Sequence, residues 1–176
     1  RETADRVFPR GVSEMLRHWS DLSDRTMLAE IAGRDLAGMG VRQRVAAALR
    51  VRIEVNAMHK EAVRRALSHL ALPQNTTVAL GNTLRTVDAV WYAAGDTATD
   101  FSYYSKRALL TPVYASTVLY WIDDHSEEFV DTWDFIDRRL DDIMRIPRFT
   151  GGLKRLFNPL SWWSGRGTDW EPRQPA

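Results

Sequence analysis

The sequence contains no cysteine among its 176 residues. This absence excludes a disulfide framework, cysteine-ligated zinc or iron–sulfur sites and thiol catalysis. The sequence also has no large excess of one charge sign, because it contains 24 basic and 23 acidic residues and its net charge is +1. We therefore expect no general electrostatic attraction to nucleic acid.

Long hydrophobic runs are also lacking. The most apolar stretch, Ala108 to Ile122, has 15 residues, whereas a helix needs about 20 to cross a bilayer. The sequence starts at Arg1 with neither a signal peptide nor an initiator methionine, so we expect the natural protein to continue upstream.

Hydrophobic residues make up 44% of the chain, which is enough for a folded core. Their spacing is helical almost throughout, and no strand alternation or internal repeat is present. The pattern predicts an all-α bundle of about seven or eight helices. The clearest expected helices cover residues 11–32, two segments within 41–70, 77–94, 100–122 and 127–145. We expect Pro112 to kink the fifth of these, and Gly95 to cap the fourth in a left-handed conformation.

Signatures of catalysis are scarce. The paired Glu-x-x-His steps of a di-metal bundle are missing, and Gly151-Gly152 lacks the Lys-Ser/Thr that completes a phosphate-binding loop. Ser13, Glu14 and His18 do not define an activated nucleophile. The sequence therefore predicts no enzyme, metal or cofactor.

Three aromatic features remain, and the first is the trio Asp88, Trp91 and Tyr92. These residues share one helix face by their i, i+3, i+4 spacing. One or both rings exposed beside an acid would be typical of a protein-interface hot spot. A wide buried stripe, with only the Tyr92 hydroxyl at its rim, is equally compatible with the spacing.

The second feature is the segment from Phe101 to Ile122, which is apolar or aromatic on nearly every side. Such a helix is central, lines a cavity or forms a dimer interface, and simple core packing is the most common case. Hydroxyls on Thr111, Ser116 and Thr117 would give a pocket for a mostly apolar ligand a few polar groups.

The third feature is the basic, tryptophan-rich end of the chain. Its apolar positions follow helical spacing beside two basic residues, which favours a short amphipathic helix at a lipid surface. A helix that docks on the protein itself is the alternative. The candidate membrane-associating residues are Leu153, Lys154, Arg155, Leu156, Phe157, Leu160, Trp162 and Trp163.

The run from Trp91 to Arg107 reads Trp-Tyr-x-x-Gly-Asp-x-x-x-Asp-Phe-x-x-Tyr-x-x-Arg. It resembles the signature of the Coq-nine family of ubiquinone-biosynthesis accessory proteins. Flanking runs agree, namely Arg64-Arg65-Ala66-Leu67 upstream and Phe129 to Ile136 downstream. The likeness extends from about Phe8 to Met144.

The resemblance implies a TetR-like fold that binds lipid. It implies a non-catalytic protein that holds an isoprenoid quinone precursor or a phospholipid and presents the precursor to the demethoxyubiquinone hydroxylase. Such a protein is expected as a homodimer, peripheral on the inner membrane, in the cytoplasm of a bacterium or on the matrix side of a mitochondrion. No nucleic acid partner is expected.

The family's partner-binding element falls on Asp88, Trp91 and Tyr92, which favours their exposure. A Trp91→Ala, Tyr92→Ala double variant is then expected to keep its fold and to bind the hydroxylase less tightly. The candidate lipid-binding residues of the central helices are Leu84, Val87, Phe101, Tyr104, Val113, Tyr114, Thr117 and Trp121.

These expectations divide the chain into three parts. Residues 1–10 would be a remnant of the helix-turn-helix region, 11–146 a lipid-binding bundle and 147–176 an amphipathic tail. The alternative function is a TetR-type transcriptional regulator with a hydrophobic ligand, although few basic residues near the start could contact phosphates. Pro112 also interrupts a helix that the resemblance implies to be continuous.

Overall fold

The computed structural model describes residues 6–96 and 101–145. The described residues are helical with no strands, as the apolar periodicity predicts. The elements include α2 (Val12–Ala32), α3 (Val41–Glu54), the short 3-10 turn η1 (Ala57–His59), α4 (Lys60–Leu70), the turn η2 (Pro73–Asn75), α5 (Thr76–Ala93), α6 (Phe101–Asp123), the turn η3 (Glu127–Phe129) and α7 (Val130–Arg145).

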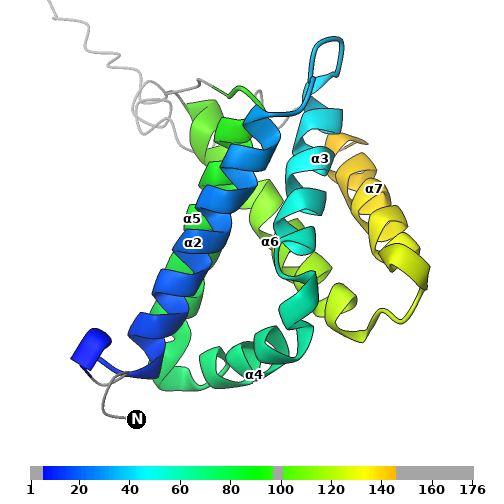
Figure 1. The fold of residues 1–176 in the computed structure, drawn as a ribbon. Coiled ribbons are helices and arrows are strands. Elements are labelled where there is room, and N and C mark those ends of the chain that lie inside the picture. The colour runs from blue at the N-terminus through cyan, green and yellow to red at the C-terminus, as the bar shows by residue number, and fades with distance from the viewer. Residues whose placement is uncertain (1–5, 97–100, 146–176) are drawn as a thin grey trace, which may run out of the picture. The chain divides into compact units, whose positions relative to one another are not determined.

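The break between α3 and α4 lies where the sequence loses its helical phase. Asn56 is buried there. Its Nδ2 donates to the Arg52 carbonyl at 3.1 Å, and its Oδ1 accepts a hydrogen bond from the Ser23 hydroxyl at 3.1 Å. These bonds give a buried amide its partners and turn the chain into α4, which lies across the end of the bundle where α2 begins and α3 ends (Figure 1).

Gly95 ends α5 as predicted. Its φ of +84° is a left-handed conformation that glycine adopts without strain. The Gly95 amide donates to the Tyr92 carbonyl at 2.9 Å, and the Asp96 amide donates to the Trp91 carbonyl at 3.0 Å. This pair of bonds satisfies carbonyls that the helix end would otherwise leave free.

The helix α6 continues through Pro112 as one element. The three hydroxyls expected to serve a pocket bond to carbonyls of their own helix instead. Thr111 donates to Arg107, Ser116 to Pro112 and Thr117 to Val113, at 2.7–2.8 Å. Such bonds between a side chain and its own helix are common for Ser and Thr, and they leave these hydroxyls with a structural role.

Asp124 organises the start of α7. Its carboxylate accepts bonds from the backbone amides of Ser126 at 2.7 Å and Thr132 at 3.0 Å. Burial alone would raise the pKa of Asp124, but the hydrogen bonds from Ser126 and Thr132 lower it to about 2. The charged carboxylate therefore caps the helix across the left-handed turn at Glu128 and Phe129.

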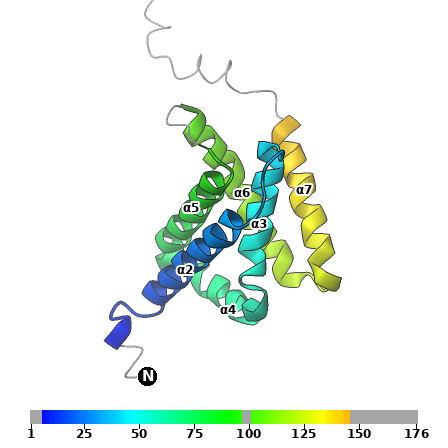
Figure 2. The ribbon, with the colours of Figure 1, turned by 45° about the horizontal axis from the view of Figure 1, so that its top comes forward.

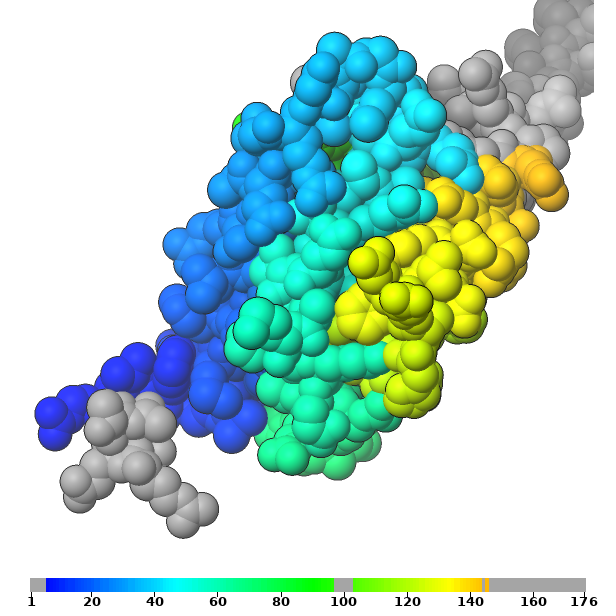
Figure 3. Space-filling model, turned by 45° about the vertical axis from the view of Figure 1, so that its right-hand side comes forward, coloured from blue at the N-terminus to red at the C-terminus, as the bar shows by residue number. Residues whose placement is uncertain are grey.

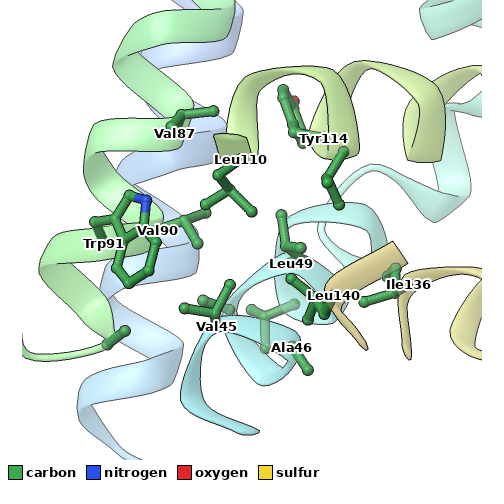
Figure 4. Close-up of a cluster of buried hydrophobic side chains, with 14 of the residues drawn as sticks. Val45, Ala46, Leu49, Val87, Val90, Trp91, Leu110, Tyr114, Ile136 and Leu140 are labelled. Atoms are coloured by element: carbon green, nitrogen blue, oxygen red, sulfur yellow. The ribbon is translucent and has the colours of Figure 1, made fainter. Parts of the chain in front are cut away.

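The main core lies where α3 meets α5, α6 and α7. Figure 4 shows Val45 and Leu49 of α3 among side chains from the other three helices. The helices α2 and α5 lie side by side in both ribbon views (Figures 1 and 2). The helix α7 lies against α3 (Figure 3), where Arg50 of α3 pairs with Asp137 of α7 at 2.7 Å.

Candidate functional site

A cavity of about 260 Å³ lies among α2, α3, α4, α5 and α6. Ala115 and Leu119 of α6 line it and are exposed to solvent, so the cavity opens to the surface beside α6. Its walls are mostly apolar. The lining residues are Leu16, Trp19, Ser20, Ser23, Arg52, Ile53, Asn56, Val63, Ala66, Leu67, Leu70, Ala79, Asn82, Thr83, Thr86, Tyr114, Ala115, Val118, Leu119 and Trp121.

The apolar face of α4 supplies one wall. Val63, Ala66, Leu67 and Leu70 follow the i, i+3, i+4, i+7 spacing of a single helix face. None of them is fully buried, although all four line the cavity. The face that would normally be covered by core side chains therefore borders open space.

A buried ion pair lies beside the cavity, and its Arg52 member is one of the lining residues. The Arg52 Nε of α3 donates to the Asp24 Oδ1 of α2 at 2.7 Å. The Thr86 hydroxyl of α5 donates to both carboxylate oxygens of Asp24, at 2.9 and 3.1 Å. These bonds connect three helices through one buried carboxylate.

Other polar side chains also line the cavity. The Ser23 hydroxyl donates to Asn56, as described above, and the Arg85 Nη2 donates to the Asn82 Oδ1. Ser23, Asn56 and Asn82 all line the cavity and are buried. The helices α2, α3 and α5 thus contribute hydrogen-bonding groups to the lining, whereas α4 contributes only apolar ones.

Two of the predicted lipid-binding residues, Tyr114 and Trp121, line this cavity. Val87, Val113 and Thr117 do not line it, because they are buried in the packing between helices. The lining of this cavity therefore does not include these three, and their role in lipid binding stays a prediction.

Leu84 and Tyr104 are exposed on the outside of their helices, and neither lines the cavity. The side chain of Phe101 lies outside the described residues. Sequence reasoning missed the contribution of α2 and α4. The strong amphipathicity of α4, with apolar residues at four regularly spaced positions, was the available signal.

The two neighbouring aromatic residues of α5, Trp91 and Tyr92, lie in different environments. Tyr92 is 73% exposed, whereas Trp91 is only 7% exposed and belongs to the main core. Figure 4 shows Trp91 beside Val90. The Lys106 Nζ lies 5.5 Å from the centre of the Trp91 ring, a cation–π contact. The prediction that one or both rings are exposed is therefore confirmed by Tyr92, whereas Trp91 points inward.

Asp88 lies one helical turn from Tyr92, and its side chain is half exposed. Its Oδ1 accepts bonds from the Arg107 Nε at 2.7 Å and from the Tyr103 hydroxyl at 3.1 Å. Both donors come from α6, so Asp88 fixes α6 against α5 beside the exposed Tyr92 ring.

The candidate membrane-associating residues from Leu153 to Trp163 lie outside the described residues. Of the helices that are described, none is long and apolar enough to cross a membrane. Within residues 6–96 and 101–145, no group of three or more His, Asp or Glu side chains could hold a metal ion.

Residues 76–147 match the family model described as COQ9. The chain is 45% identical over 82 residues to the ubiquinone biosynthesis protein COQ9 of Rattus norvegicus, covering 47% of this chain and 26% of that protein. It is 32% identical over 119 residues to the probable ubiquinone biosynthesis protein coq9 of Dictyostelium discoideum, covering 68% and 39%. The matched segments thus span well under half the length of these relatives.

A solved structure shares the fold. The chain resembles the crystal structure of a TetR transcriptional regulator from Nitrosomonas europaea, with a TM-score of 0.63 and 24% sequence identity. The likeness covers 78% of this chain and 75% of the regulator. Residues 76–147 of this chain therefore belong to the COQ9 family, and the fold that carries them is TetR-like.

Proposed function

We propose that this protein is a non-catalytic accessory factor of ubiquinone biosynthesis that binds an isoprenoid quinone precursor. The observation that carries the proposal is the open, mostly apolar cavity of about 260 Å³ in a chain with a COQ9-family segment. Relatives of that segment are named ubiquinone biosynthesis proteins. An apolar cavity with a few polar groups is typical of a site for a mostly apolar ligand.

The cavity volume limits how much of a ligand can enter. An engineered apolar cavity of about 150 Å³ in another protein accommodates benzene. By that scale, 260 Å³ holds one substituted ring and the first part of a chain. A long isoprenoid tail would continue past Ala115 and Leu119 at the mouth of the cavity.

Exchange with a membrane would be reversible. Moving an alkyl chain from lipid into an apolar protein site changes its contact with water little, so the transfer gains little free energy. We propose that the basic, tryptophan-rich residues 153–163 bring the protein to the bilayer surface, peripheral on the inner membrane, where such exchange occurs. Relatives named mitochondrial are consistent with the matrix side in a eukaryote.

The partner would be the demethoxyubiquinone hydroxylase. Tyr92 supports this part of the proposal, because a ring that is 73% exposed beside a fixed carboxylate suits a protein interface. The bonds from Arg107 and Tyr103 to Asp88 connect this surface to α6.

The ligand is tested by extracting the purified protein with organic solvent and identifying the extract by mass spectrometry. We expect an isoprenoid quinone, a quinone precursor or a phospholipid at close to one molecule per chain. A protein that contains no lipid after purification and takes up no isoprenoid quinone from loaded vesicles would contradict the proposal.

A further inference from the structure

Arg52 is an unusual group for the wall of an apolar cavity. Arg52 is only 8% exposed, and it lines the cavity. Within the described part of the chain its only side-chain hydrogen bond is the one from Nε to Asp24. The two terminal nitrogens of the guanidinium therefore retain donors that a ligand could use, because an arginine carries five N–H groups.

Tyr114 contributes a second polar group to the same wall. It is 9% exposed and lines the cavity from α6. Its ring also belongs to the main hydrophobic core, where Figure 4 shows it on α6. The Tyr114 hydroxyl has no hydrogen-bond partner among the described residues. It is not fully enclosed by protein atoms either. A ligand in the cavity could thus meet both Arg52 and Tyr114.

Burying the ion pair between Arg52 and Asp24 costs the fold free energy. Burial raises the pKa of Asp24, and the attraction of Arg52 together with the bonds from Arg52 and Thr86 only partly offsets this. Buried pairs of this kind often add no stability compared with apolar residues. Asp24 does, however, hold the Arg52 guanidinium in one position, which is what a binding group needs.

The uneven lining gives a ligand one preferred direction. The α4 residues that line the cavity are all apolar, whereas Arg52 and Tyr114 bring hydrogen-bond donors from α3 and α6. An amphiphile satisfies both kinds of lining only when its polar end points to Arg52. The reverse orientation would leave a buried guanidinium facing hydrocarbon, which is unfavourable.

We propose that the Arg52 guanidinium and the Tyr114 hydroxyl bind the head of the ligand, and that the head is a ring or chain end carrying oxygen atoms that accept hydrogen bonds. The tail lies against α4 and leaves the cavity past Leu119. This assignment rests on the proposed function and adds the direction of binding and the head-binding residues. Because the head is enclosed, delivery to a partner enzyme requires the ligand to leave the cavity.

The test compares two ligands that differ only in the head. A decyl-substituted benzoquinone carries ring oxygens, and decylbenzene carries none. Both are delivered from cyclodextrin, and their dissociation constants are measured by titration calorimetry. We expect the parent protein to prefer the quinone by about tenfold or more, the effect of a hydrogen bond to a charged group.

The decisive variant replaces the ion pair as a unit. Asp24→Leu with Arg52→Met should reduce the preference for the quinone to about threefold, the share that the Tyr114 hydroxyl contributes, and leave the affinity for decylbenzene unchanged. Arg50→Met is the matched control, because Arg50 lies on the same helix and pairs with Asp137 outside the cavity. It should keep the full preference.

Different results would contradict the head-group site and the proposed function. A parent that binds both ligands equally, or a double variant that keeps the preference, overturns the head-group site and leaves the apolar cavity intact. A parent that binds neither ligand overturns the proposed function as well. If the double variant does not fold, Tyr114→Phe provides the test. It keeps the ring and should lower the preference about threefold or more, and an unchanged preference would reject the assignment.

Discussion

An Asp24→Ala variant is expected to lose about 3–5 kcal/mol of unfolding free energy, because it leaves Arg52 as a buried charge without its partner. Both side chains are about nine-tenths buried, and their 2.7 Å contact connects α2 to α3. The loss also removes the acceptor of the Thr86 hydroxyl on α5. Urea denaturation followed by circular dichroism measures the change.

The matched control removes both charges together. Asp24→Leu with Arg52→Met should have a stability close to that of the parent or above it, since apolar replacements of a buried pair are often neutral or favourable. If the single Asp24→Ala variant lost less than about 1 kcal/mol, the pair would not be buried as described.

Trp91→Ala should destabilise the protein by about 3–5 kcal/mol, the usual cost of truncating a large core aromatic residue. Tyr92→Ala, one position along the same helix, should change stability by less than about 0.5 kcal/mol. The contrast follows from exposed fractions of 7% for Trp91 and 73% for Tyr92. Thermal unfolding of the two single variants measures it.

The same pair of variants separates folding from partner binding. Tyr92→Ala should stay folded and bind the demethoxyubiquinone hydroxylase less tightly in a pull-down or surface-binding assay. The Trp91→Ala, Tyr92→Ala double variant does not separate the two effects, because removing the buried Trp91 ring also destabilises the fold. Undiminished hydroxylase binding by the folded Tyr92→Ala protein would exclude Tyr92 from the interface.

The helices were predictable from the sequence because local rules determine them. In α5, the apolar residues Leu80, Leu84, Val87 and Trp91 follow 4, 3, 4 spacing, and Gly95 ends the helix in a left-handed conformation that glycine adopts without strain. These signals act over a few residues, so they do not depend on the rest of the fold.

The cavity depends on contacts that the sequence does not display. Asp24 and Arg52 are 28 positions apart, and their pairing follows only from how α2 packs on α3. Trp91 and Tyr92 are adjacent and similar in character, yet packing buries one and exposes the other. Periodicity indicates that α4 has an apolar face, but it does not indicate whether that face meets side chains or open space.

The most direct measurement of the central claim is the amount of lipid bound by a cavity-filling variant. Ala66 lines the cavity from α4, whereas Ala62, one turn earlier, is exposed and does not. We expect Ala66→Trp to remain helical and to carry little extractable lipid, while Ala62→Trp carries as much as the parent. Full lipid content in a folded Ala66→Trp protein would show that the ligand binds elsewhere.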